Sequence, residues 1–288
     1  MSATKDFPPC PLAGSGVHFW LLGAANHCRN RGVTTNDAER WIAERITRPP
    51  NPPNEIVSAI RKAYSEKFTG SGATYFKQEP KWPSVNLEQR EAIIRDNGGL
   101  ADLWELSPVR IEDNGRHAEE IIDRLFPGNP LLCCGQSNSS FDTKTREAWR
   151  GQLHNLQLIV PSPMSALTGL TKEGKESKHS LNNTGDRRFL ICEFDSGTSD
   201  EHAALLIHLG GFAPLVCAVH SGGKSLHGWF FVEGQPDDKL TKFFHYAVSL
   251  GACHAPNSKC QFVRMPDGTR DNGKRQTVYF LNYLKGVL

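Results

Sequence analysis

Two apolar runs separated by a short glycine-containing turn constrain the fold more than any other feature of this sequence. Leu215–Val219 and Trp229–Val232 each have the length and composition of a buried β-strand. Small and polar residues lie between them, including Ser221, Gly222, Gly223 and Lys224. The pattern predicts two adjacent strands joined by a turn, around which the rest of a sheet can form.

The segments on either side of this hairpin extend the sheet. Apolar patterning predicts a strand over about 188–195, a helix that begins at Thr198 or Ser199 and ends at Gly210-Gly211, a helix over about 236–250 and a last strand over 277–281. The order β-α-β-β-α-β is typical of α+β proteins with a ferredoxin-like or RRM-like core. Many activities use that fold, so the function must be inferred from the site.

The turn itself has residues suited to binding an anion. Its backbone amides can point at one phosphate, and Lys224 adds a positive charge. His227 enters the following strand, where its ring could donate to a phosphate oxygen. The alternative interpretation is an ordinary glycine-rich hairpin with a solvated lysine.

A pair of carboxylates precedes this turn in the sequence. Glu193 and Asp195 alternate along the predicted strand and therefore share a face. Two carboxylates so placed repel each other unless a cation lies between them, and Mg²⁺ or Mn²⁺ held together with substrate phosphates is the usual arrangement. The alternative is a solvated pair on an edge strand.

The chain is expected to have two folded parts. Helical periodicity predicts a helical module over 1–66, followed by a linker over 67–85 that contains glycine and proline, and an α+β domain over 86–288. The module is locally basic, and a solvated bundle surface is the favoured interpretation of its charges: Arg29, Arg31, Arg40, Arg45, Arg48, Arg61 and Lys62.

A polar segment over 137–150, in which aromatic and basic residues alternate, precedes the carboxylate strand. Further bases crowd the approach to that strand: Lys172, Lys175, Lys178, His179, Arg187 and Arg188. These residues could form a contact surface for nucleic acid or a charged surface loop, and both interpretations stay open.

Composition excludes several classes of protein. The formal net charge is only +2, so any contact with nucleic acid must come from local patches. None of the eight cysteines forms a CxxC pair, and Cys253-His254 with Cys260 is the single cluster that resembles metal ligands. No apolar run approaches the roughly 18 residues of a membrane span, and the first residues lack a signal-peptide core, so we expect a cytoplasmic protein without membrane contact.

Three of these features together resemble the archaeo-eukaryotic primase superfamily, in its bacterial, plasmid and phage branch. They are Glu193-Phe194-Asp195, the small-x-His turn that ends at His227, and the basic-x-Pro element Arg264-Met265-Pro266. The resemblance covers roughly 130–285, and the helical front end resembles modules attached to such primases. It implies a primase-polymerase nucleotidyltransferase that adds nucleoside triphosphates on a single-stranded DNA template during replication, with a replicative helicase as a partner.

The resemblance also implies a role for each matching residue. Glu193 and Asp195 would bind the divalent metals, whereas Ser221, Gly222, Gly223, Lys224 and His227 would hold the triphosphate. Arg264 would face the nucleotide or template. In this interpretation Glu193, Asp195 and His227 are the catalytic residues, and the cofactor is Mg²⁺ or Mn²⁺.

One position departs from the family pattern. A third acid is expected after the second helix of the core, where this sequence has Cys253, a poor ligand for Mg²⁺. Asp267 or Asp271 could substitute, although both follow Arg264. The alternative function is therefore a catalytically inactive relative that binds nucleic acid or nucleotide.

A nicking endonuclease on the same ferredoxin-like frame is disfavoured, because the sequence contains no His-x-His pair. A two-layer domain whose turn and acids do not act together is the simplest remaining interpretation.

Overall fold

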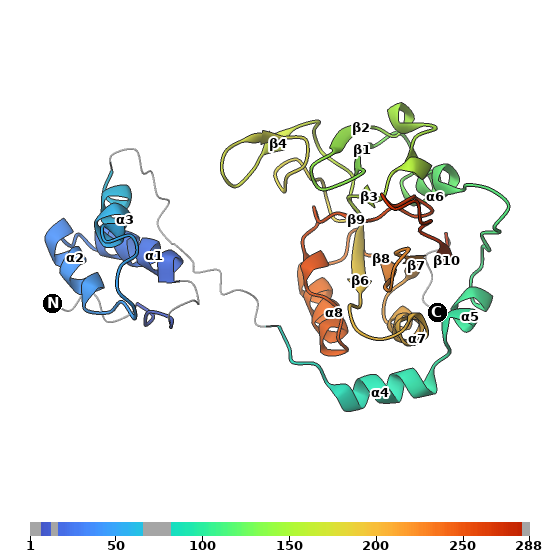
Figure 1. The fold of residues 1–288 in the computed structure, drawn as a ribbon, viewed down its shortest axis with the longest axis horizontal. Helices are drawn as coiled ribbons and strands as arrows, with labels where there is room; N and C mark the ends of the chain where they lie inside the picture. Colours follow the sequence, from blue (N-terminus) through green and yellow to red (C-terminus); the bar gives the residue numbers. More distant parts are fainter. Residues whose placement is uncertain (1–6, 13–16, 66–81, 284–288) are drawn as a thin grey trace. The chain divides into compact units, whose positions relative to one another are not determined.

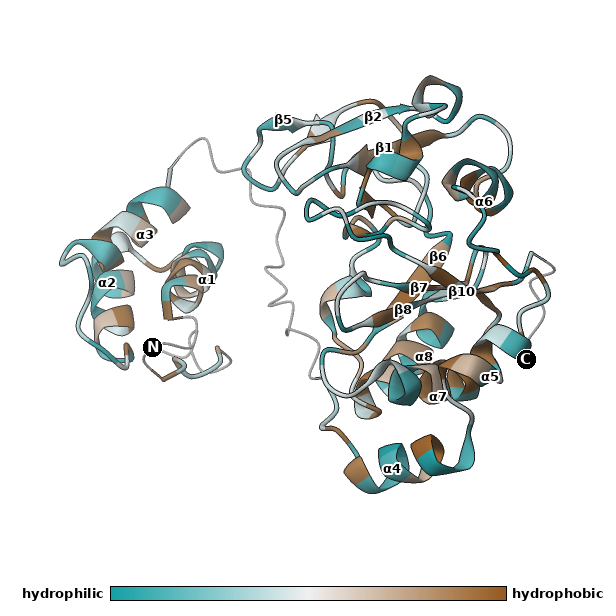
Figure 2. Cartoon of the chain, turned by 45° about the vertical axis from the view of Figure 1, so that its right-hand side comes forward, coloured by the Kyte–Doolittle hydropathy of each residue, from teal (hydrophilic) through white to brown (hydrophobic). Residues whose placement is uncertain are grey.

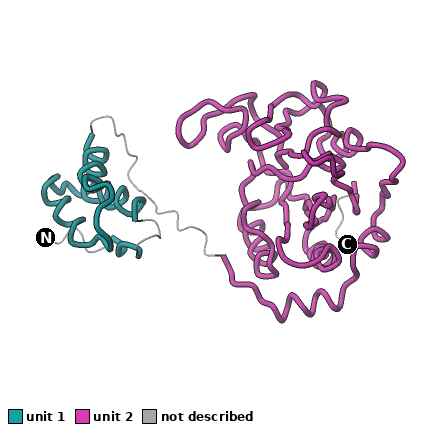
Figure 3. The backbone as a smooth tube through the Cα atoms, in the orientation of Figure 1, with its two compact units in different colours: residues 1–81 teal, residues 82–288 magenta. Residues whose placement is uncertain are grey.

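The computed structural model describes residues 7–12, 17–65 and 82–283. The chain divides into two units, residues 1–81 and 82–288 (Figure 3). Residues 67–81 of the expected linker lie outside the described residues, and residues 82–85 belong to the second unit. Among the described residues, no helix combines the length and the hydropathy needed to cross a membrane.

Helices α1 (Val17–Asn30), α2 (Thr35–Ala43) and α3 (Glu55–Ala63) form the first unit. They pack through small and apolar side chains, among them Trp20, Leu21 and Ile42. Glu55 is buried among them and accepts two hydrogen bonds from the Arg48 guanidinium, at 2.8 and 2.9 Å. One member of the basic set is therefore a structural partner of a buried acid.

A four-stranded antiparallel sheet lies at the centre of the second unit. Its strands are β6 (Phe189–Glu193), β7 (Leu215–His220), β8 (Leu226–Phe231) and β10 (Val278–Leu281), in the order β10-β7-β8-β6. The predicted order of elements is present, since α7 (Ser199–Gly210) joins β6 to β7 and α8 (Asp237–Ser249) follows β8. In a ferredoxin-like sheet the first and last strands are neighbours, whereas here β6 and β10 lie at opposite edges. The α+β class is thus observed, and the specific ferredoxin-like sheet is not confirmed.

The two faces of this sheet have different coverings (Figure 1). Leu190 and Cys192 pack with α7, α8, α4 (Leu87–Asp96) and α5 (Leu100–Glu105). Phe189 and Ile191 face a second core, to which α6 (Ala118–Leu125) and a second sheet contribute. Both faces are apolar, and the strands accordingly appear mostly hydrophobic in Figure 2. Side-chain alternation along β6 therefore serves two cores instead of one core and solvent.

The second sheet is also antiparallel and provides the other wall of the candidate site. Its strands are β1 (Leu131–Gly135), β2 (Phe141–Thr145), β3 (Leu158–Ile159) and β9 (Val263–Arg264), in the order β2-β1-β3-β9. Short pieces complete the unit: the strands β4 (Gly169–Leu170) and β5 (Glu176–Ser177) and the 3₁₀ helices η1 (Glu147–Trp149), η2 (Leu153–Asn155) and η3 (Ala255–Asn257). Because β9 lies between α8 and β10 in the chain, the chain leaves the first sheet, adds a strand to the second and returns. This excursion places Arg264 opposite the strands that carry Glu193 and His227.

Candidate functional site

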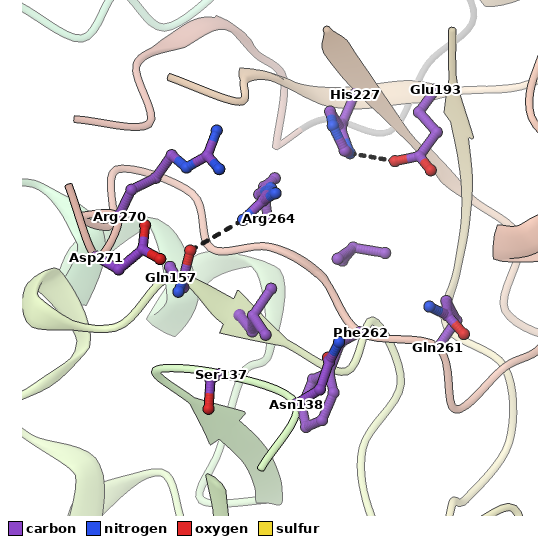
Figure 4. A pocket seen from close by; sticks show the side chains of 12 residues that line it. Ser137, Asn138, Gln157, Glu193, His227, Gln261, Phe262, Arg264, Arg270 and Asp271 are labelled. Carbon is purple, nitrogen blue, oxygen red and sulfur yellow. Dashed lines mark hydrogen bonds and ion pairs between the residues drawn. The ribbon is translucent and has the colours of Figure 1, made fainter. Parts of the chain in front are cut away.

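A polar cavity of about 370 Å³ lies where the two sheets face each other (Figure 4). The first sheet contributes Glu193 and His227. Most of the other lining residues come from the second sheet, its β1–β2 turn and the loop after β9: Ser137, Asn138, Gln157, Leu158, Gln261, Phe262, Val263, Arg264, Arg270 and Asp271. A cavity lined by both signs of charge and by neutral amides can bind a polar, charged ligand.

Glu193 and His227 form a close pair on one wall. They stand directly opposite each other in the antiparallel pairing of β6 with β8, so their side chains share a face. His227 Nδ1 lies 2.8 Å from Glu193 Oε2. Burial raises the pKa of Glu193, but the contact with His227 and the charges of His227 and Arg264 outweigh it, and the pKa is lowered. Glu193 is therefore a carboxylate at neutral pH.

Two arginines occupy the facing wall. Burial and the nearby charge of Arg270 lower the pKa of Arg264, while Glu193 and Asp271 oppose that shift. Arg270 Nε is buried and has no hydrogen-bond partner among the described residues. Like charges held together with an unpartnered donor favour an anion between them. Arg270 is a candidate that the sequence interpretation missed, because it lies in a polar turn typical of a solvated loop.

Gln157 holds Arg264 in place. Its side-chain oxygen accepts a hydrogen bond from Arg264 Nη1 at 3.1 Å, and its amide nitrogen donates to the carbonyl of Gln136. The residue is buried. It was also missed, although a polar residue within the apolar run 156–160 was a usable signal.

Asp195 and Cys253 lie next to Glu193 and outside the cavity lining. Phe194 pairs with Ala252 as an isolated antiparallel bridge, and the Cys253 N–H donates to the Glu193 carbonyl at 2.8 Å. Burial raises the pKa of the Cys253 thiol, and the carboxylates of Asp195 and Glu193 raise it further. The structure therefore places a neutral thiol beside both acids, at the position where the resemblance predicts a third acid.

The two aspartates considered as substitutes lie elsewhere. Asp267 is fully buried, accepts hydrogen bonds from Arg275 Nε and the His117 N–H, both at 2.5 Å, and adopts a φ of +57°. Its carboxylate is occupied within the protein. Asp271 is exposed and lines the cavity beside Arg264.

The glycine turn has the expected left-handed residue but uses several of its amides internally. Gly222 has a φ of +71°. The Ser221 N–H donates to the Ser225 carbonyl at 2.8 Å, and the Gly222 N–H donates to His220 Nδ1 at 3.2 Å. The turn residues do not line the cavity: Ser221, Gly222, Gly223 and Lys224. Arg270 connects the turn to the cavity, because its Nη1 donates to the Ser221 carbonyl at 3.5 Å.

Some of the bases that precede β6, which could form a nucleic-acid surface or a charged loop, are paired with acids. Arg146 is buried against Glu119 and Asp123, at 2.7 and 2.8 Å, and Lys178 lies 2.7 Å from Asp142. Arg188 pairs with Glu233. Lys172 and Lys175 are exposed. Ser137 and Asn138, from the same polar segment, line the cavity.

Metal-ligand geometry is limited in the described part of the chain. No group of three or more His, Cys, Asp or Glu side chains there is arranged to hold a metal ion. The sequence cluster of Cys253, His254 and Cys260 therefore does not form such a group in the described residues. All eight cysteines are free thiols. Two carboxylates can still suffice for Mg²⁺ or Mn²⁺, because these ions usually take their remaining ligands from water and substrate phosphates.

No protein-family model, no curated protein and no solved structure matches the chain.

Proposed function

We propose that the cavity between the two sheets binds a nucleoside triphosphate and that the chain is a primase-polymerase-like nucleotidyltransferase. One observation carries the proposal: Arg264 and Arg270 face the Glu193–His227 pair across one cavity, and Arg270 Nε is buried with no hydrogen-bond partner in the described part of the chain. A polyphosphate would relieve the repulsion between the arginines and accept a hydrogen bond from that nitrogen.

The proposal includes a divalent cation that would arrive with the substrate. Glu193 and Asp195 would hold Mg²⁺ or Mn²⁺, and the bound metal would activate a primer hydroxyl and neutralise the departing pyrophosphate. His227 contacts Glu193 and lines the same cavity, so it is placed to contact both the acid and a phosphate oxygen. A DNA template, a helicase partner and a cytoplasmic role in replication are parts of this proposal. We relate the core to such enzymes by its order of elements, because its strand order differs from the ferredoxin-like one.

Calorimetric titration with a non-hydrolysable deoxynucleoside triphosphate, with Mn²⁺ present, tests the binding site. We expect His227→Ala and Arg270→Met each to weaken binding about 10- to 100-fold, the range for losing one charge-assisted hydrogen bond. Arg110→Met serves as the control, because Arg110 is exposed and pairs with Glu105 at 2.6 Å. Unchanged binding in both site variants would exclude this cavity.

Template-directed extension of a primer tests the chemistry. Glu193→Ala should abolish extension while leaving the fold intact, as judged by circular dichroism. Full activity of that variant would overturn the assignment.

Cys253 favours a second candidate function, a nucleotide-binding or nucleic-acid-binding relative without catalysis. The neutral thiol beside Asp195 adds no charge for a metal. In this case the wild type binds the triphosphate without extending a primer, and Cys253→Asp gains metal-dependent extension. Primer extension by the wild type would exclude this second candidate.

A further inference from the structure

A buried arginine of α4 joins the two loops that carry Asp195 and Cys253. Arg90 Nη1 donates to the Leu250 carbonyl at 2.8 Å, and Nη2 donates to the Ser196 carbonyl at 3.1 Å. Arg90 is 8% exposed. One loop follows β6 and the other follows α8, so this guanidinium ties together segments from different elements.

Both loops are shaped to admit the guanidinium. Gly197 and Gly251 have φ angles of +106° and +96°, which favour glycine. A Cβ on Gly197 would lie 2.1 Å from Glu201 Oε2 and 2.9 Å from Arg90 Nη2, and one on Gly251 would lie 3.1 Å from Arg90 Nη1. Glycine therefore allows each loop backbone to approach the arginine closely.

The helix that carries Arg90 is itself anchored to the end of α8. The Asn86 side chain caps α4 by accepting from the Gln89 N–H at 3.1 Å, and the Asn86 N–H donates to the Ser249 carbonyl at 2.8 Å. Arg90 thus projects from a helix whose start is fixed to one of the two loops it connects.

Backbone contacts also connect the two segments next to these loops. The Phe194–Ala252 bridge and the hydrogen bond from the Cys253 N–H to the Glu193 carbonyl join the segments just before the loops diverge. Arg90 adds a planar guanidinium that reaches one carbonyl of each loop, which a lysine amine on a flexible stem does less well.

We propose that Arg90 is a positioning residue that sets the placement of Asp195 relative to Glu193 and Cys253. This inference deepens the proposed function, because the same placement would set the affinity of the two carboxylates for a divalent cation. Arg90 does not line the cavity, whereas Arg264 and Arg270 do. A change at Arg90 should therefore leave the proposed anion contacts of those two arginines in place.

The rate at which iodoacetamide alkylates Cys253, measured by mass spectrometry of the full chain, reports on the loops without depending on the proposed function. We expect Arg90→Gln to raise this rate several-fold and Arg90→Lys to raise it less, while Cys260 reacts at the wild-type rate in all variants. Arg95→Gln is the control, because Arg95 lies on the same helix, is exposed and contacts Asp96. A wild-type Cys253 rate in folded Arg90→Gln would overturn the inference.

Direct Mn²⁺ binding, followed by electron paramagnetic resonance of the free ion, tests the consequence for the acids. Arg90→Gln should weaken Mn²⁺ binding about 10-fold while metal-free pyrophosphate still binds as in the wild type. An equal loss of both would indicate general unfolding and contradict a positioning role. If the wild type binds no Mn²⁺ although Arg90→Gln accelerates Cys253 alkylation, the metal part of the proposed function fails and the positioning of the loops stands.

Discussion

His227 Nδ1 contacts Glu193 Oε2 at 2.8 Å because the two residues stand opposite each other on β8 and β6. The acid that resembles a metal ligand therefore has a partner within the protein before any ligand binds. A cation that takes this carboxylate must share it with His227 or displace the ring, and a displaced ring would turn towards the rest of the cavity. If the proposed function holds, metal binding and contact of His227 with phosphate would be coupled through this pair.

The lowered pKa of Glu193 predicts how stability depends on pH. Its ionised form is favoured by folding, so its contribution is present above its unfolded pKa of about 4.3 and is lost as pH falls through the lower folded pKa. We expect the difference in free energy of unfolding between wild type and Glu193→Gln to grow as pH rises from about 3 to about 5. Urea denaturation across that range measures it, and a difference independent of pH would contradict the pairing.

Arg270 should cost stability in the absence of an anion. Its charge adds to that of Arg264, so Arg270→Met is expected to raise the melting temperature in phosphate-free buffer and to remove the stabilisation that pyrophosphate gives to the wild type. Thermal denaturation with and without pyrophosphate checks both effects. Lys274→Met, an exposed change in the same turn, should leave the stabilisation intact. A variant that melts lower and still responds to pyrophosphate would refute this role.

Asp267 is predicted to be structural. Asp267→Asn removes the buried carboxylate from Arg275, which keeps its ion pair with the exposed Asp113. We therefore expect a loss of about 1–3 kcal/mol, the cost of leaving a buried hydrogen-bonding group unsatisfied. Asp271→Asn, at an exposed position, should change stability by less than about 0.5 kcal/mol. Chemical denaturation distinguishes the two, and equal stabilities would show that Asp267 is available to a ligand.

The glycine turn gives a test of backbone geometry with a neighbouring control. Gly222→Ala forces a side chain into a φ of +71° and places its Cβ 3.1 Å from the Arg275 carbonyl, so we expect a loss of about 1–2 kcal/mol. Gly223→Ala meets the flexible end of the Arg270 side chain at 3.1 Å and Ser221 Oγ at an ordinary 3.5 Å, and should cost less. Thermal denaturation of both variants measures the difference. A larger loss in Gly223→Ala would contradict the turn geometry.

Features that depend on near neighbours in the chain were predictable. Thr198 caps α7 by accepting from the Glu201 N–H, Gly210 and Gly211 end that helix, and the small residues around Gly222 turn β7 into β8. The resemblance predicts that Cys253 takes the place of a third acid, and that role stays a prediction; the structure shows the thiol beside Glu193 and Asp195. The helix cap and the turn depend on contacts within a few residues, so their signals are present in the sequence.

The sequence by itself therefore determined the α+β class, the order of the core elements and some of the residues that could carry chemistry, among them Glu193 and His227. Only the tertiary structure decided that β6 lies at a sheet edge, that β9 pairs with β3 in a second sheet, and that Arg270 joins Arg264 in one cavity. It also showed that Asp267 is occupied by Arg275. The physical reason is that helix caps and tight turns are stabilised by local contacts. Pairing between distant strands depends instead on the packing of the whole core, and no single segment of the sequence predicts it.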